Sequence, residues 1–193
     1  MTQKIAILRG INVGGKRKIL MADLKALFSE LNFSKITTYI QSGNVIFDTD
    51  GKAEDLALSK RLEKAINERF GFDVPVIIRT ANELEQAINQ NPFFKGDPDL
   101  AHLHLTLLNE EPTPENQLQL QTYNYEPDKF VLDGKDVFIY CAGKYHESKL
   151  TNNFFEKKLK VSATTRNWKT VLKLVEISRA APTPGAPGKG WLS

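Results

Sequence analysis

Residues 7–21, ILRGINVGGKRKILM, join an apolar strand pattern to an amphipathic helix through a glycine-rich, cationic loop. The apolar run at residues 4–8 (KIAIL) is typical of a short strand that is buried on both faces. Beyond the loop, apolar side chains recur every three or four positions, at Met21, Leu24, Leu27, Phe28 and Leu31. This spacing predicts a helix over about residues 21–31.

The next fifty residues complete a recognisable unit. Residues 35–41 and 45–48 are rich in β-branched and aromatic types and flank a Ser-Gly-Asn turn, so we predict a hairpin. A second amphipathic helix is predicted over about 53–70, followed by a strand at 74–79. The order β-α-β-β-α-β within about residues 1–80 is that of a ferredoxin-like unit.

The same order of elements begins again after a helix and connector at residues 81–100. In residues 101–181 the pattern predicts a strand at 102–108, a short helix at 113–123 and a hairpin closed by Asp133-Gly134. It then predicts helices over about 151–158 and 165–179. We interpret this part as a degenerate ferredoxin-like half without an obvious last strand.

The predicted fold class is α/β (α+β), with two ferredoxin-like halves packed into one compact body. Residues 182–193 are rich in proline and glycine and predict a flexible tail.

Composition indicates a soluble globular protein, because 41% of the residues are hydrophobic and 25% are charged. Charged residues interrupt the early apolar runs, and no stretch approaches the length of a membrane span, so we expect no membrane partner. A single cysteine, Cys141, excludes an internal disulfide and fits a reducing cytoplasm.

Charge is distributed unevenly along the chain. Residues 1–22 hold five cations and no acid, residues 109–128 hold five acids and no Lys or Arg, and residues 141–173 hold eight cations and two acids. Two basic segments of this kind converge on one positive face or lie scattered in solvent, and the sequence leaves both arrangements open.

Three blocks carry a resemblance to a known family: RGINVGG at 9–15, TYIQSGNVIF at 38–47 and TTRNW at 164–168. In this order they resemble the pattern of the bacterial domain of unknown function 1697 family. The resemblance covers nearly the whole chain except the tail. It implies a two-part α/β fold with ferredoxin-like halves, and it implies no established activity.

The loop after the first strand is the first candidate site. Its glycines allow close approach of a ligand, and its cations precede a helix N-terminus, where an oxyanion is favoured. The candidate ligand-binding residues there are Arg9, Asn12, Gly14, Gly15, Lys16 and Lys18, with Arg17 between the last two. The spacing matches neither common phosphate-binding glycine motif.

Two further blocks supply candidate residues. Asn44 lies at the predicted hairpin tip, which we expect at the opposite end of the unit from the glycine loop. Arg166 and Asn167 lie at the predicted start of the last helix, where Thr164 or Thr165 is expected to cap it and the arginine fork suits a phosphate or carboxylate.

The sequence names no catalytic group and no cofactor. His102 and His104 alternate along one strand, but neither they nor His146 has a supporting acid or second cysteine at a metal-binding spacing, so no metal is expected. No paired carboxylates or nucleophile and base can be placed together from spacing alone.

Three functions follow from this pattern. The first is binding of a phosphate-bearing or other anionic ligand, a nucleotide or a nucleic acid, at the basic loop. The second is an enzyme acting on a small anionic substrate between the two halves, which requires Arg9, Asn12 and Arg166 to converge in one pocket. The third is a protein-interaction domain without a ligand.

Overall fold

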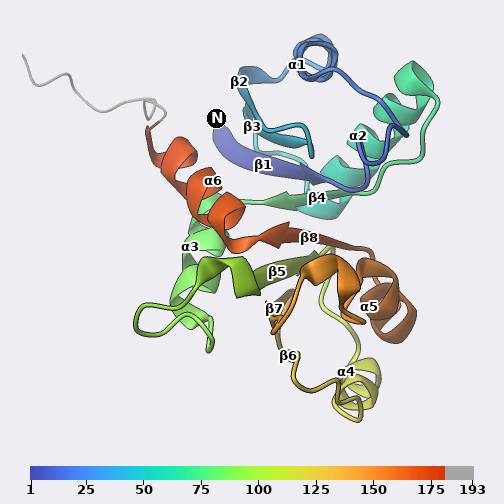
Figure 1. The fold of residues 1–193 in the computed structure, drawn as a ribbon. Coiled ribbons are helices and arrows are strands. Elements are labelled where there is room, and N and C mark those ends of the chain that lie inside the picture. Colours follow the sequence, from blue (N-terminus) through green and yellow to red (C-terminus); the bar gives the residue numbers. More distant parts are fainter. Residues whose placement is uncertain (181–193) are drawn as a thin grey trace, which may run out of the picture.

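The computed structural model describes residues 1–180, which form two four-stranded antiparallel sheets covered by helices (Figure 1). The elements of the first half are β1 (Thr2–Leu8), α1 (Met21–Glu30), β2 (Ser34–Tyr39), β3 (Asn44–Thr49), α2 (Asp55–Phe70), β4 (Val76–Arg79) and α3 (Ala81–Gln90). Its sheet has the order β2-β3-β1-β4, which is the predicted ferredoxin-like arrangement. The tail predicted over residues 182–193 lies outside the described residues.

The second half repeats the first. Its elements are η1 (Leu100–His102), β5 (Leu103–Leu108), α4 (Pro114–Leu120), β6 (Lys129–Asp133), β7 (Asp136–Tyr140), η2 (Tyr145–Glu147), α5 (Asn152–Leu159), β8 (Ala163–Asn167) and α6 (Trp168–Ala180). The sheet order β6-β7-β5-β8 matches that of the first sheet position by position. The predicted fold of two ferredoxin-like halves is confirmed.

The prediction that the second half lacks its last strand is wrong. β8 occupies residues 163–167 and pairs with β5, so the final helix begins at Trp168 rather than near residue 165. The side chain of Asn167, not of Thr164 or Thr165, caps this helix by accepting a hydrogen bond from the Thr170 amide at 2.8 Å. The β-branched threonines suit the strand that precedes it.

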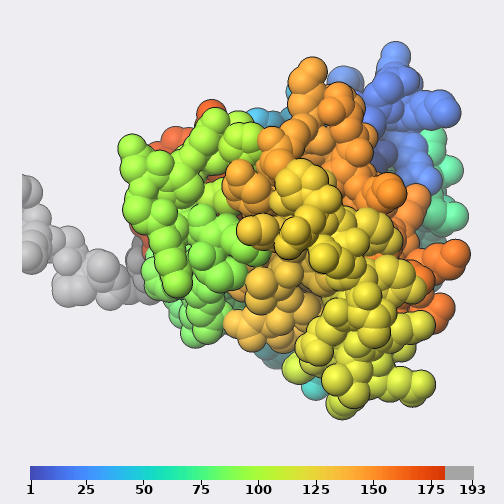
Figure 2. Space-filling model, turned by 60° about the horizontal axis from the view of Figure 1, so that its bottom comes forward, coloured from blue at the N-terminus to red at the C-terminus, as the bar shows by residue number. Residues whose placement is uncertain are grey.

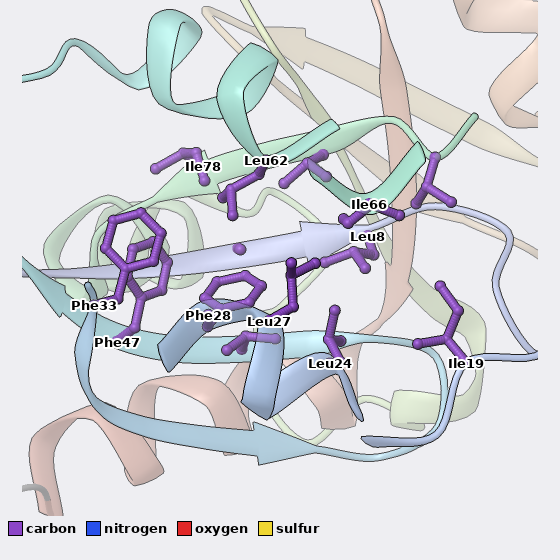
Figure 3. Close-up of a cluster of buried hydrophobic side chains, with 14 of the residues drawn as sticks. Leu8, Ile19, Leu24, Leu27, Phe28, Phe33, Phe47, Leu62, Ile66 and Ile78 are labelled. Atoms are coloured by element: carbon purple, nitrogen blue, oxygen red, sulfur yellow. The ribbon is translucent and has the colours of Figure 1, made fainter. Parts of the chain in front are cut away.

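Three apolar layers hold these elements together. Helices α1 and α2 cover the outer face of the first sheet, where Phe28, Phe33 and Phe47 pack with ring centroids 4.7–5.7 Å apart (Figure 3). Helices α4 and α5 cover the outer face of the second sheet.

The middle layer joins the two halves. Ile5 and Ile7 on the inner face of β1 pack in one cluster with Leu105 and Leu107 on β5, and α3 and α6 add Leu84 and Trp168 among others. Both faces of each sheet are therefore covered by protein, and the prediction that the first strand is buried on both faces is confirmed.

A buried arginine at the end of β4 crosses from the first half to the second. The guanidinium of Arg79 is 2% exposed and donates to the carbonyl oxygens of Leu108 at 2.8 Å and Lys135 at 3.0 Å. The Asp136 carboxylate lies 3.5 Å from it, an ion pair without a hydrogen bond. These three partners lie at the end of β5, in the turn of the β6–β7 hairpin and at the start of β7.

A second buried arginine crosses in the reverse direction from β8. The guanidinium of Arg166 donates through Nη2 to the carbonyl oxygens of Leu8 at 2.6 Å and Gly43 at 3.3 Å. Its Nε donates to Asn44 Oδ1 at 2.8 Å. These partners lie at the end of β1 and in the turn of the β2–β3 hairpin, the positions that Arg79 contacts in the other half.

The contacts of Arg79 and those of Arg166 differ in one residue at the hairpin that each arginine meets. The first residue of the third strand is Asn44 in the first half and Asp136 in the second, and each lies opposite the penultimate residue of the first strand. Burial raises the pKa of the Asp136 carboxyl, although Arg79 lowers it in part. Because its pKa in the folded chain exceeds the unfolded value, this carboxyl stabilises the fold below the ordinary aspartate pKa. That contribution is lost as the pH rises through the folded pKa.

We therefore predict that Asp136→Asn, which copies the neutral junction of the first half, is more stable than the parent at pH 7. The gain is expected to shrink as the pH falls through the raised folded pKa toward the ordinary aspartate value, because the folded parent is then neutral at this position too. Urea denaturation of both proteins across pH 4–7 measures the difference. A variant that is less stable at pH 7 would show that the pairing with Arg79 outweighs the cost of burial.

Candidate functional site

The glycine-rich loop between β1 and α1 folds as a small hairpin. Its strands are joined by two backbone hydrogen bonds, from the Asn12 amide to the Arg17 carbonyl at 3.1 Å and from the Lys16 amide to the Val13 carbonyl at 3.0 Å. Gly14 and Gly15 form the turn with φ of 58° and 73°, a conformation that L side chains rarely adopt. These positive φ angles explain why both turn positions are glycine.

The side chain of Asn12 fastens the base of this hairpin to the body. Its Oδ1 accepts a hydrogen bond from the Ile19 amide at 2.9 Å, and its Nδ2 donates to the carbonyl oxygens of Ile19 at 2.9 Å and Gln41 at 2.8 Å. Ile11 and Ile19 on either side are buried in the first apolar layer. The base of the loop is therefore anchored, and Asn12 has a structural role.

The tip of the hairpin carries the cations. Lys16, Arg17 and Lys18 are all exposed, and none forms an ion pair with a carboxylate of residues 1–180. Val13 and Leu20 beside them are 65% and 68% exposed. We call residues 12–18 the cationic loop. Helix α1, which follows it, is capped by Leu20 without a side-chain hydrogen bond.

The β2–β3 hairpin tip lies beside this loop, so the expectation that it lies at the opposite end is wrong. The reason is strand direction: β1 and β3 are antiparallel, with Ile7 opposite Asn44, so β1 ends where β3 begins. The Leu8 amide donates to the Gly43 carbonyl at 2.8 Å. A Cβ at Gly43 would lie 2.7 Å from a methyl carbon of Ile11, so the tip requires glycine there.

The second half also reaches this end of the molecule. Arg9 donates through Nη2 to Asn153 Oδ1 at 2.5 Å and forms an ion pair through Nη1 with Glu156, and both partners lie on α5. In Figure 2 the blue N-terminal segment accordingly lies beside the orange segment of the second half. The two basic segments of the sequence therefore do meet, through Arg9 and through the hydrogen bond of Arg166 to Leu8.

Arg166 is buried within this junction rather than displayed to a ligand. It is 8% exposed, and besides its contacts to the first half its Nη1 donates to Thr164 Oγ1 at 3.2 Å and to the Thr165 carbonyl at 3.1 Å. Burial lowers its pKa to about 10, so it remains charged at neutral pH. Asn44 is fully buried and donates to the Tyr39 carbonyl at 3.0 Å.

The predicted site residues thus fall into two groups. Four of them converge around the end of β1, but their polar atoms bind partners within the chain: Arg9, Asn12, Asn44 and Arg166. Asn167 is exposed and caps α6. Lys16 and Lys18, with Arg17, remain open to solvent on the glycine turn. The shared pocket that the enzyme hypothesis requires is not formed by Arg9, Asn12 and Arg166.

Hollows of the surface lie elsewhere. One of about 460 Å³ separates α2 from the second half and is lined by Lys60, Glu63 and Ser162 among others. None of the nine candidate residues named from the sequence lines it. It therefore gives no support to an anion site between the halves built from those residues.

The sequence singled out His104 only as a metal candidate and did not predict the polar group in which it lies on the outer face of the second sheet. His104 is 7% exposed and stacks on Tyr145 with ring centroids 4.5 Å apart, and burial lowers the pKa of this histidine. Nearby, Thr165 donates to Asn152 Oδ1 at 2.7 Å and bonds Thr106. The alternation of His104 and Thr106 along β5 was the available signal, since both face away from the inner layer.

Within residues 1–180, no three His, Cys, Asp or Glu side chains are grouped so as to hold a metal ion. Over the same residues, no helix combines the length and the apolar character that crossing a membrane requires.

Comparison with known proteins adds a family and a fold. The family described as "Protein of unknown function (DUF1697)" matches residues 1–138. Among solved structures, the conserved bacterial protein SP0830 from Streptococcus pneumoniae is similar, with a TM-score of 0.72 and 23% identity over 92% of this chain and 98% of that chain. No curated protein matches.

We predict that Arg166→Met destabilises the fold by about 3 kcal/mol or more, because the carbonyl oxygens of Leu8 and Gly43 and the amide oxygen of Asn44 lose their buried donor. Lys16→Met, at an exposed position without a partner carboxylate, serves as the matched control and is expected to change stability by less than about 0.5 kcal/mol. Guanidinium chloride denaturation measures both. Equal, small effects would refute the cross-linking role of Arg166.

Proposed function

Because the chain belongs to the DUF1697 family of proteins of unknown function, we propose a function from its own structure: the cationic loop binds the phosphate backbone of a single-stranded nucleic acid. The observation that carries this proposal is the set of three exposed cations, Lys16, Arg17 and Lys18, without a partner carboxylate among residues 1–180. Neighbouring cations outside the loop differ, since Lys4 pairs with Asp55 and Arg9 with Glu156.

The charge arrangement supports an anionic ligand. Three adjacent cations repel one another, and bound phosphates relieve that repulsion while counterions are released from the nucleic acid. The loop base is fixed by Asn12 and by the buried side chains of Ile11 and Ile19, so the loop itself loses little conformational entropy when a ligand binds. Arg17 remains near the body, with Nη1 3.4 Å from the site of a Cβ on Gly10.

The shape of the loop favours a polymer over a single nucleotide. Gly14 and Gly15 form the end of a projecting turn, and the side chains at the turn are exposed rather than enclosed. A small nucleotide is usually bound in a concave pocket, whereas a strand of phosphates can lie across a projecting surface. The exposed Val13 and Leu20 add apolar contacts suited to the unpaired bases and sugars of a single strand.

Binding on the sheet face, as in RNA-recognition modules, is disfavoured. Those modules stack bases on aromatic side chains of an open sheet, and here Ile5 and Ile7 face the second half while Ala6 and Leu8 face α1 and α2. The proposed contact is therefore to phosphates, and we expect little dependence on base sequence.

The test replaces Lys16, Arg17 and Lys18 together by Gln and measures fluorescence anisotropy with a labelled single-stranded oligonucleotide. At low salt we expect the affinity to fall about tenfold or more. The slope of log affinity against log salt concentration is expected to decrease by about 2, since each lost phosphate contact contributes roughly 0.7.

The matched control replaces Lys64, Lys95 and Lys169 by Gln, which removes the same charge from exposed positions elsewhere. It is expected to retain most of the affinity. Equal weakening in both variants, or no binding by the parent at low salt, overturns the proposal. Displacement of the oligonucleotide by stoichiometric ATP would instead indicate a small-ligand site.

A further inference from the structure

The two matching edge strands, β2 and β6, differ in how they are protected. β2 has a break in its pairing between Ser34 and Thr37, and Lys35 there has a φ of 49°. Such bulges prevent an edge from pairing with another strand. β6 pairs with β7 in unbroken register from Lys129 to Asp133, so its free edge is regular. Of these two equivalent edges, only β6 is suited to accept a further strand.

The backbone groups that β6 offers follow from its register. Asp133 lies opposite Asp136 across the two-residue turn, and such a closing pair is hydrogen-bonded in a hairpin of this length. Bonding then alternates, so Val131 is bonded to Phe138, while the N–H and C=O groups of Phe130 and Leu132 point away from β7. Two residues of the strand therefore present unpaired donors and acceptors at the free edge.

The space beside this edge is open. A hollow of about 640 Å³ runs along it, lined by Phe130, Val131 and Leu132 of the strand and by Tyr123 and Tyr125 of the preceding segment. Val131 is 40% exposed. β6 lies at the bottom of the molecule in Figure 1, on the side that faces forward in Figure 2. An approaching strand is not blocked by the first half.

The side chains of β6 are complementary to themselves. Lys129, Val131 and Asp133 alternate along its exposed face, and neither charged side chain forms an ion pair or hydrogen bond within residues 1–180. In an antiparallel pair of two β6 strands centred on Val131, each Lys129 faces Asp133 of the other copy. The same register sets Phe130 opposite Leu132, so the outward backbone groups meet as hydrogen-bonded pairs.

We propose that two copies of this chain associate through antiparallel pairing of their β6 strands, which joins the two second-half sheets into one continuous eight-stranded sheet. The interface is isologous, because the same five residues form both sides. The occupant is a second copy rather than an unrelated strand, because charge, register and hydrogen-bonding pattern all match when β6 meets itself. This proposal does not depend on the cationic loop.

The experiment is sedimentation velocity over a concentration series of the full chain, with charge swaps on β6. The parent is expected to show a monomer–dimer equilibrium. Each single variant, Lys129→Asp or Asp133→Lys, places like charges opposite one another at both charged contacts between the two β6 strands. Each is therefore expected to weaken the dimer about tenfold or more. The double variant Lys129→Asp/Asp133→Lys restores opposite charges and is expected to restore the dimer.

Mixing the two single variants gives a second readout. The β6 strand of Lys129→Asp carries two carboxylates and that of Asp133→Lys carries two ammonium groups, so opposite charges meet at both contacts and a heterodimer is expected. Both positions are exposed, so melting temperatures close to that of the parent establish that the variants fold. Thr37→Asp on the protected edge β2 is the control and is expected to leave the dimer unchanged. A parent that stays monomeric throughout, or a dimer indifferent to the single swaps, overturns the proposal.

Discussion

A buried guanidinium must have its donors satisfied, and this requirement determines how the two halves of the chain fit together. Arg79 and Arg166 each lie in the last strand of one half. Each donates to the last carbonyl of the first strand and to the hairpin turn of the other half. Apolar packing between the sheets favours contact but is not directional. The hydrogen bonds at the two arginines select one orientation of one sheet on the other, because any other leaves buried polar groups unpaired.

This constraint also explains why the polar residues that the sequence singled out at one end of the molecule have partners within the chain. Arg166 holds the end of β1 and the β2–β3 turn, Arg9 joins the same end to α5, and Asn12 ties the next loop to the hairpin tip. These side chains are used to build a rigid base. The cations of the following glycine turn are exposed beyond that base and have no partner carboxylate among residues 1–180.

Much of the fold was predictable from sequence because it rests on local patterns: the 3.6-residue period of α1, the hairpin signal Asp133-Gly134, and the order of elements in each half. β8 was missed because Thr-Thr-Arg-Asn-Trp suits a helix cap as well as a strand, and its pairing with β5 is a contact across some sixty residues of sequence. The position of the β2–β3 tip depended on strand direction, which periodicity does not encode. The cations of the loop were evident from composition, whereas the burial of Arg166 depended on the packing of the other half.

Arg79 and Arg166 make reciprocal contacts, each from one half of the chain to the other. In a symmetric homodimer of one βαββαβα unit, a single arginine makes the same contact twice, once in each direction. The present chain makes that contact with Arg79 and again with Arg166, at equivalent strands and turns. Two units of this kind are joined here in one chain, so a contact that is symmetric between two subunits is made within a single polypeptide. The two contacts are not identical, because Asn44 occupies in the first half the position that Asp136 occupies in the second.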